Sequence, residues 1–164
     1  MNVEGTERIA FRFTRGEIAA LLKLMNAPSL PEMNLPAAAP DKRTELSLVE
    51  DGVVMPCGER TLVDGTVAAV MRNVLTSRRR LLAASEKGRL ALYRGAQMCV
   101  LAEENGPELV TLEPFPDVRA ARRPFFTAAD ALGAEAELTF STDGDETPGG
   151  AGALQAMYAR FEDQ

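Results

Sequence analysis

The fold class is decided by residues 79–115, which read RRLLAASEKGRLALYRGAQMCVLAEENGPELVTLEPF. Four short apolar runs in this stretch are separated by KG, GA and ENGP, which are turn sequences of hairpin length. The pattern predicts a four-stranded antiparallel meander, and AELTFST at residues 136–142 predicts a fifth strand. Some runs are apolar at successive positions, as in Met98 to Leu101, so both strand faces are apolar. We therefore expect the sheet to be covered on both sides, by helices or by a second copy of the chain.

The residues before the meander predict a strand and three helices. IAFRFT (residues 9–14) alternates as a half-buried strand does, and Thr14 with Glu17 forms a capping-box sequence for a first helix. The proline-rich segment 27–40 predicts an irregular arm, followed by a second helix over residues 41–52 and a very short strand at VVMP. A third helix is expected to begin near Asp64, and its inner face carries Val67, Val70, Met71 and Val74.

The carboxyl-terminal third is expected to contain helix, strand and an acidic tail. DVRAARRPFFTAADAL predicts a short helix interrupted at Pro124, and AGALQAMYARF predicts an amphipathic helix. DGDETPGG, residues 143–150, has the composition of an exposed loop. We predict one α+β domain over residues 1–164, with a helical part at about 14–75, an antiparallel sheet at about 79–115 and the remainder at 116–164. Helices are expected on one face of the sheet.

Composition excludes several classes of function. The chain has no histidine, which removes the commonest acid–base catalyst and transition-metal ligand. Its only cysteines, Cys57 and Cys99, are too few for a zinc site or a disulfide framework and are expected to be reduced. DGDE lacks the remaining ligands of a calcium loop, and GGAGA lacks the context of a phosphate loop. We predict no catalytic residue, no metal and no cofactor, and hence a protein that is not an enzyme.

Charge is distributed unevenly along the chain. Residues 72–94 carry seven basic side chains against Glu86, whereas the tail from Glu135 carries seven acidic side chains against Arg160. Strand alternation sends Arg79 and Arg80 to opposite faces, so Arg78 and Arg80 are the pair expected to share a face and bind an acidic partner. The acidic tail of the same chain is the first partner to consider. With a net charge of −6, general nucleic-acid binding is disfavoured.

The order of elements between Thr14 and Phe126 resembles the EspG family of ESX (type VII) secretion-associated proteins. The resemblance rests on FTRGEIAALLKLM from Phe13, ELSLVEDGVV from Glu45, TLVDGTVAAVMRNVLTSRRRLLA from Thr61 and GRLALYRGAQMCVLAEENGPELVTLEPF from Gly88. It implies cytosolic, chaperone-like binding of secretion substrates without catalysis. Family members are longer and contain two similar halves about a pseudo-two-fold axis, whereas this chain matches about one half. A homodimer paired through the meander would supply the second half. No contact residue can be transferred.

The expected function is therefore a non-enzymatic protein-binding module, a cytoplasmic chaperone or adaptor for helical type VII secretion substrates. The amino terminus has no basic region followed by an apolar run, and no segment approaches the length of a membrane span, so we expect neither a signal peptide nor a membrane anchor. The alternative is a winged-helix-like DNA-binding protein that uses the basic hairpin 78–94. The 14-residue proline-rich gap between the first two helices and a sheet that continues past this hairpin count against it.

Overall fold

The computed structural model describes residues 9–132, 137–142, 145–149 and 154–163. The amino-terminal part contains the following elements: β1 (Phe11–Thr14), α1 (Arg15–Leu24), β2 (Ser29–Leu30), β3 (Leu35–Pro36), α2 (Lys42–Glu50), β4 (Val54–Cys57), β5 (Arg60–Val63) and α3 (Gly65–Thr76). The remainder contains β6 (Arg79–Ser85), β7 (Gly88–Arg94), β8 (Cys99–Asn105), β9 (Leu109–Phe115), α4 (Val118–Leu132), β10 (Glu137–Thr142), β11 (Asp145–Gly149) and α5 (Leu154–Asp163).

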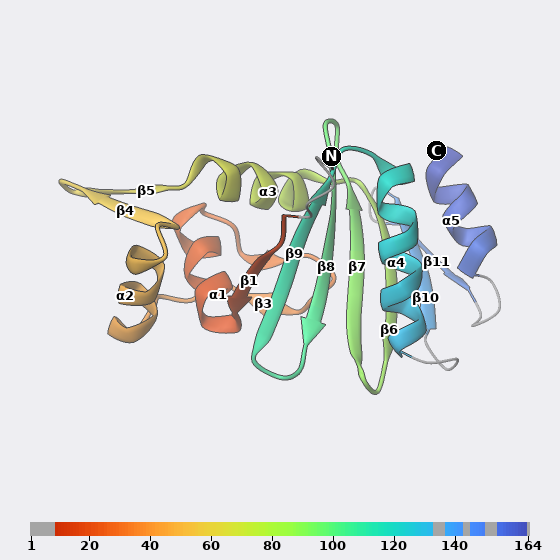
Figure 1. The fold of residues 1–164 in the computed structure, drawn as a ribbon, viewed down its shortest axis with the longest axis horizontal. Helices are drawn as coiled ribbons and strands as arrows, with labels where there is room; N and C mark the ends of the chain where they lie inside the picture. The colour runs from red at the N-terminus through yellow and green to blue at the C-terminus, as the bar shows by residue number, and fades with distance from the viewer. Residues whose placement is uncertain (1–8, 133–136, 143–144, 150–153, 164) are drawn as a thin grey trace, which may run out of the picture.

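The predicted meander lies at the centre of a larger antiparallel sheet (Figure 1). β6 to β9 pair in sequence, β1 adds to β9, and β10 followed by β11 adds to β6, giving the order β1-β9-β8-β7-β6-β10-β11. This confirms the α+β class and the strand expected at residues 136–142. Because β6 and β9 are both paired on their outer sides, the meander has no free edge through which a second copy could pair.

Each face of the sheet has its own hydrophobic core. On one face, Tyr93, Val100 and Ala102 pack with α1, α3 and the proline-rich segment. On the other face, Leu92 and Leu101 pack with α4 and α5. The two-sided burial explains the apolar runs that fail to alternate with polar residues. The expectation of helices on one face only was wrong, because α4 and α5 return to cover the second face.

Local sequence signals explain where the helices begin. Thr14 caps α1 in a complete capping box with Glu17, and Asp41 accepts a hydrogen bond from the backbone N–H of Thr44 at the start of α2. Asp64 accepts from the backbone N–H groups of Thr66 and Val67 at the start of α3. All three predicted helix starts are therefore confirmed, each by a side chain that satisfies otherwise unpaired backbone donors.

Two predictions for the carboxyl-terminal third were wrong. α4 runs without interruption through Pro124, because packing of its buried face, including Ala121 and Phe125, outweighs the missing backbone donor. The segment expected to be a loose loop contains β11, whose backbone pairs with β10 from Thr142↔Asp145 to Leu138↔Gly149. The rest of that prediction, at residues 143–144 and 150, and the glycine-rich residues 150–153 lie outside the described residues. The predicted final helix is confirmed, with Met157, Tyr158 and Phe161 buried.

Candidate functional site

The three consecutive arginines occupy two different environments. Arg78 and Arg79 line a hollow together with Arg94 at the end of β7, whereas Arg80 points towards Glu32 of the proline-rich segment. Arg78 and Arg80 therefore do not share a surface as expected, because Arg78 precedes β6 and strand alternation does not govern its direction. Binding of a partner by either side chain stays a prediction.

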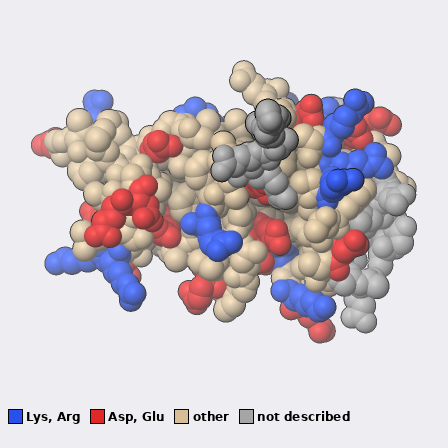
Figure 2. All heavy atoms as spheres, in the orientation of Figure 1, with Lys and Arg blue, Asp and Glu red and all other residues tan. Residues whose placement is uncertain are grey.

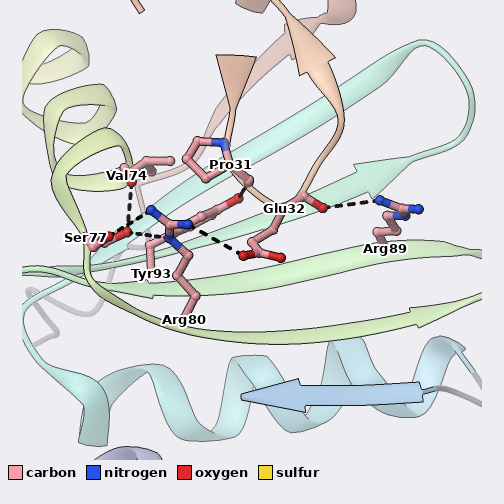
Figure 3. Close-up of polar contacts among 7 residues, drawn as sticks. All are labelled: Pro31, Glu32, Val74, Ser77, Arg80, Arg89 and Tyr93. Carbon is pink, nitrogen blue, oxygen red and sulfur yellow. Dashed lines mark hydrogen bonds and ion pairs between the residues drawn. The ribbon is translucent and has the colours of Figure 1, made fainter. Parts of the chain in front are cut away.

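Arg80 is part of a polar network inside the molecule (Figure 3). Its Nη1 lies 3.5 Å from Glu32 Oε1, its Nε donates to Ser77 Oγ at 3.2 Å, and its Nη2 donates to the Ser77 carbonyl at 2.9 Å. Ser77 Oγ in turn donates to the Val74 carbonyl at the end of α3, at 2.8 Å. Arg80 thereby connects the end of α3, the first residues of β6 and the proline-rich segment.

Tyr93 anchors the same segment from the sheet. Its side chain is fully buried, and its hydroxyl donates to the carbonyl oxygen of Pro31. Burial raises the pKa of Tyr93 well above its ordinary value, and the nearby charge of Glu32 raises it further, while Arg80 lowers it. A phenol that stays protonated is a permanent hydrogen-bond donor, so the Tyr93 hydroxyl holds the proline-rich segment in place.

The contacts of Arg80 and Tyr93 hold the proline-rich segment in a strained backbone conformation. Glu32 has φ +68°, in the left-handed region that side chains other than glycine and asparagine rarely adopt. Arg80 pairs with its carboxylate, and Arg89 Nη1 donates to its carbonyl oxygen at 3.3 Å. Leu30, Met33 and Leu35 are buried, which confirms that the arm packs on the body of the protein. The network is therefore a clamp that seals the first core.

Basic side chains outside the predicted pair contact the acidic tail at its carboxyl end. Arg94 Nη1 donates to the carbonyl oxygens of Phe161 and Glu162 at 2.6 and 3.1 Å, at the carboxyl end of α5. Arg119 and Arg122 of α4 each lie 3.9 Å from the Glu162 carboxylate. In the sheet register, Arg94 pairs with Arg79, Arg79 with Thr142, and Thr142 with Asp145. The backbone thus brings the acidic hairpin to the same end of the sheet as the arginines.

An exposed apolar surface lies at the opposite end, around α2 and the hairpin formed by β4 and β5. Among the described residues, six large apolar side chains are exposed, and the five at this end are Leu24, Leu46, Val49, Met55 and Leu62. We call this surface the apolar end. Met55 and Leu62 are directly opposite each other in the β4–β5 register and are 60% and 47% exposed. Figure 1 shows the hairpin projecting beyond the sheet, and Figure 2 shows a mostly uncharged surface over it with charged side chains at its margins.

Two hollows flank the hairpin at the apolar end. One, of about 190 Å³, lies between α1, α2 and β4 and is lined chiefly by apolar groups, with Lys23 and Glu45 also contributing. The other, of about 440 Å³, lies on the side of Met55, Leu62 and Asp64. Val49, Val54 and Pro56 line both hollows. The arrangement can bind apolar side chains from a partner while its few charged groups orient that partner.

The sequence predicted only part of the apolar end. It predicted α2 and a short strand at VVMP, and it missed β5. The missed signal is the glycine between the short runs VMPC and RTLV. This residue, Gly58, forms the turn of the hairpin with a φ of +65°, which glycine adopts without strain. Exposure of Met55 and Leu62 could not have been predicted, because it depends on the absence of a covering element.

The cysteines do not form a chemical site. Cys57 is exposed near the tip of the hairpin, and Cys99 is buried in the second core. Burial raises the pKa of the Cys99 thiol to about 11, with Arg94 acting in the opposite direction. Within the described residues, no group of three or more Cys, Asp and Glu side chains is placed to hold a metal ion. In the same part of the chain, no helix has both the length and the apolar character needed to cross a bilayer.

Comparison with known proteins gives a structural likeness only. No family model matches the chain, and no curated protein matches its sequence. Among solved structures, it is similar to the Mycobacterium tuberculosis type VII secretion system chaperone EspG5, determined in complex with a PE25–PPE41 dimer. The fold resembles that of EspG5. The TM-score is 0.58 and the sequence identity 16%, over 76% of this chain and 52% of the EspG5 chain.

This likeness supports the resemblance inferred from the order of elements, at the level of the fold. At 16% identity the match does not show membership of a family, and the chain spans about half the length of the EspG5 structure. The winged-helix alternative does not describe the fold, because β6 and β7 are interior strands of a seven-stranded sheet and do not form a wing.

Proposed function

We propose that the chain is a non-enzymatic protein-binding module, a cytosolic chaperone or adaptor that binds a helical type VII secretion substrate. The observation that carries the proposal is the apolar end, where Met55 and Leu62 form an exposed cross-strand pair beside two hollows. Clustered exposed apolar side chains are characteristic of interaction surfaces. The EspG5-like fold supports the proposal, because that chaperone was determined bound to a PE–PPE protein dimer.

The ligand that fits this surface is the apolar face of an amphipathic helix. Such a helix presents apolar side chains at intervals of three and four residues, which can enter the hollows on both sides of the hairpin. Lys23, Glu45 and Asp64 at the margins can pair with the polar flanks of the helix. Covering the exposed half of Met55 and of Leu62 contributes about 1 kcal/mol each to binding.

Co-expression tests this proposal. The chain is expressed with each candidate pair of helical secretion substrates, PE25–PPE41 among them, and complexes are isolated through an affinity tag on the chain. We expect one pair to co-purify in a defined ratio, and we expect Met55→Asp or Leu62→Asp to reduce its recovery at least tenfold. Ile9→Asp is the matched control, because Ile9 is 60% exposed, as Met55 is, but does not line either hollow.

The possible results separate specific binding from general stickiness. Retention of no pair, or of every pair equally, contradicts the proposed function. Equal losses with Ile9→Asp and Met55→Asp would show that exposed apolar side chains in general are responsible.

Self-association remains a prediction, and the apolar end is the surface that we propose for it. The meander offers no free edge, and β11, at one edge of the sheet, contains Pro148, which cannot donate to another strand. Light scattering of the isolated chain distinguishes a monomer from a dimer. A dimer that persists in Met55→Asp would place the contact elsewhere.

A further inference from the structure

The outer edge of β5 carries backbone groups that face away from the hairpin. At the base of the hairpin, the Asp64 N–H donates to the Val53 carbonyl at 2.7 Å. Because successive residues of a strand turn their N–H and C=O groups to opposite sides, Leu62 also faces β4, whereas Thr61 and Val63 face away from it. In the part of the chain that the structure describes, β5 pairs with β4 alone. Thr61 and Val63 therefore each present an N–H and a C=O group at an open edge.

The edge formed by β4 is less suited to a further strand. On β4, the residues that face away from β5 are Val54 and Pro56, and proline has no N–H to donate. Figure 1 shows α2 on the β4 side of the hairpin, and the two elements are in contact. On β5, by contrast, Arg60, Thr61 and Leu62 are exposed. Addition of a strand from outside the molecule is therefore favoured at β5 and disfavoured at β4.

The sequence of β5 is complementary to a second copy of itself. In an antiparallel pair about a two-fold axis at Leu62, Thr61 and Val63 of one copy lie opposite Val63 and Thr61 of the other, and all their outward backbone groups form hydrogen bonds. The same register places Arg60 opposite Asp64 of the second copy, twice by symmetry, and opposite charges in such positions stabilise a sheet. A two-fold axis at Thr61 or at Val63 would lose both ion pairs. The charge pattern therefore selects one register and one occupant, a second copy of the chain.

Pairing in this register also covers part of the apolar end. Leu62 is 47% exposed and would lie directly opposite Leu62 of the second copy, so both side chains lose contact with water. Met55 is opposite Leu62 within the hairpin, and the two side chains of each copy would form one continuous apolar row across four strands. Only one short strand from each copy forms the contact, so we expect a weak dimer with a dissociation constant in the micromolar range.

We propose that two copies of the chain pair through the outer edges of their β5 strands, so that the two hairpins form one four-stranded antiparallel sheet. The inference rests on the self-association included in the proposed function, and it does not require a secretion substrate. Because pairing covers Leu62, the dimer and a helical ligand compete for the same side chain.

Sedimentation velocity of the isolated chain over a range of concentrations tests the inference. We expect a monomer–dimer equilibrium. Thr61→Pro removes an outward N–H without removing a hydrogen bond of the hairpin, and it should weaken the dimer by about tenfold or more. Arg60→Asp places like charges opposite each other and should weaken it by about tenfold. Arg43→Asp is the matched control and should have no effect, because Arg43 is an exposed arginine of α2 and undergoes the same change of charge.

A mixture of two variants tests the register. Arg60→Asp and Asp64→Arg should each dimerise poorly alone, because both homodimers contain like-charge pairs. Mixed in equal amounts, they should form a heterodimer in which both pairs attract, with an affinity within about threefold of that of the unchanged chain. Circular dichroism confirms that each variant is folded, a necessary check because Asp64 also caps α3.

A cross-link locates the two-fold axis. Leu62 would face Leu62 of the second copy in a non-hydrogen-bonded pair, where the Cβ atoms are close enough for a disulfide. In a Cys57→Ser background, Leu62→Cys should therefore give a covalent dimer under mild oxidation. The background substitution removes the exposed native thiol.

Three results would overturn the inference. They are a chain that stays monomeric up to millimolar concentration, a dimer that persists unchanged in Thr61→Pro, and a mixture of the charge variants that dimerises no better than its components. The first would leave the β5 edge to a different protein, and the second would place the contact on another surface. These measurements use the chain alone, so their failure is distinguishable from a failure to co-purify with helical substrates.

Discussion

Replacing Arg80 with alanine tests whether this arginine is part of a structural clamp or of a docking surface. The Arg80–Glu32 pair is shielded, with side chains 23% and 13% exposed. At the observed 3.5 Å and an effective dielectric constant of about 20, the attraction is about 5 kcal/mol before desolvation is counted. Desolvation offsets most of that, but Arg80→Ala also leaves Glu32 unpaired and removes two hydrogen bonds to Ser77. We expect a net loss of about 2 kcal/mol in the free energy of unfolding.

Urea denaturation followed by circular dichroism measures this loss, and a thermal scan should show the midpoint falling by about 4–8 °C. A double-mutant cycle with Glu32→Gln should give a coupling energy of at least about 1 kcal/mol, because the two side chains are in contact. Arg89→Ala is the control. It loses only an exposed 3.3 Å hydrogen bond to the Glu32 backbone and should cost less than about 0.5 kcal/mol.

The clamp interpretation is refuted if Arg80→Ala costs no more than Arg89→Ala, or if the cycle shows no coupling. Loss of partner binding by Arg80→Ala with unchanged stability would restore the docking role predicted from the sequence.

Four further predictions concern stability and thiol chemistry. Asp64→Ala removes the acceptor for two backbone N–H groups at the start of α3 and should cost about 1 kcal/mol, measured by urea denaturation, whereas Asp64→Asn should cost much less. Pro124→Ala should raise the thermal midpoint, because it restores a backbone donor inside α4; a lower midpoint would show that the proline ring contributes more through packing. A thiol reagent at pH 8 should label Cys57 alone in the folded chain and both cysteines after denaturation. The pKa of Cys99 is raised by folding, so the unfolded state releases its proton first, and stability should fall as pH rises from about 9 to 11.

Local signals predicted the elements that depend on neighbouring residues. The three helix caps, the four meander strands and the final amphipathic helix are each encoded within one turn or one hairpin of sequence. The interruption expected at Pro124 was wrong because the prediction considered only the missing backbone donor. Packing of the buried face of α4 outweighs that loss and keeps the helix continuous. β11 was missed because its composition is polar, and its pairing is supplied by β10. The candidate sites were harder to predict, since Glu32 lies 48 positions from Arg80 in the sequence and no periodic pattern connects them.

The sequence by itself determined the α+β class, the antiparallel meander and the absence of histidine chemistry, because periodicity, turn residues and composition are local properties. Only the tertiary structure decided which arginine faces which surface. It turned Arg80 inward to Glu32, placed Arg78 and Arg79 beside Arg94, and left Met55 and Leu62 uncovered. These outcomes depend on which distant segments cover each face of the sheet, and that is settled by long-range packing.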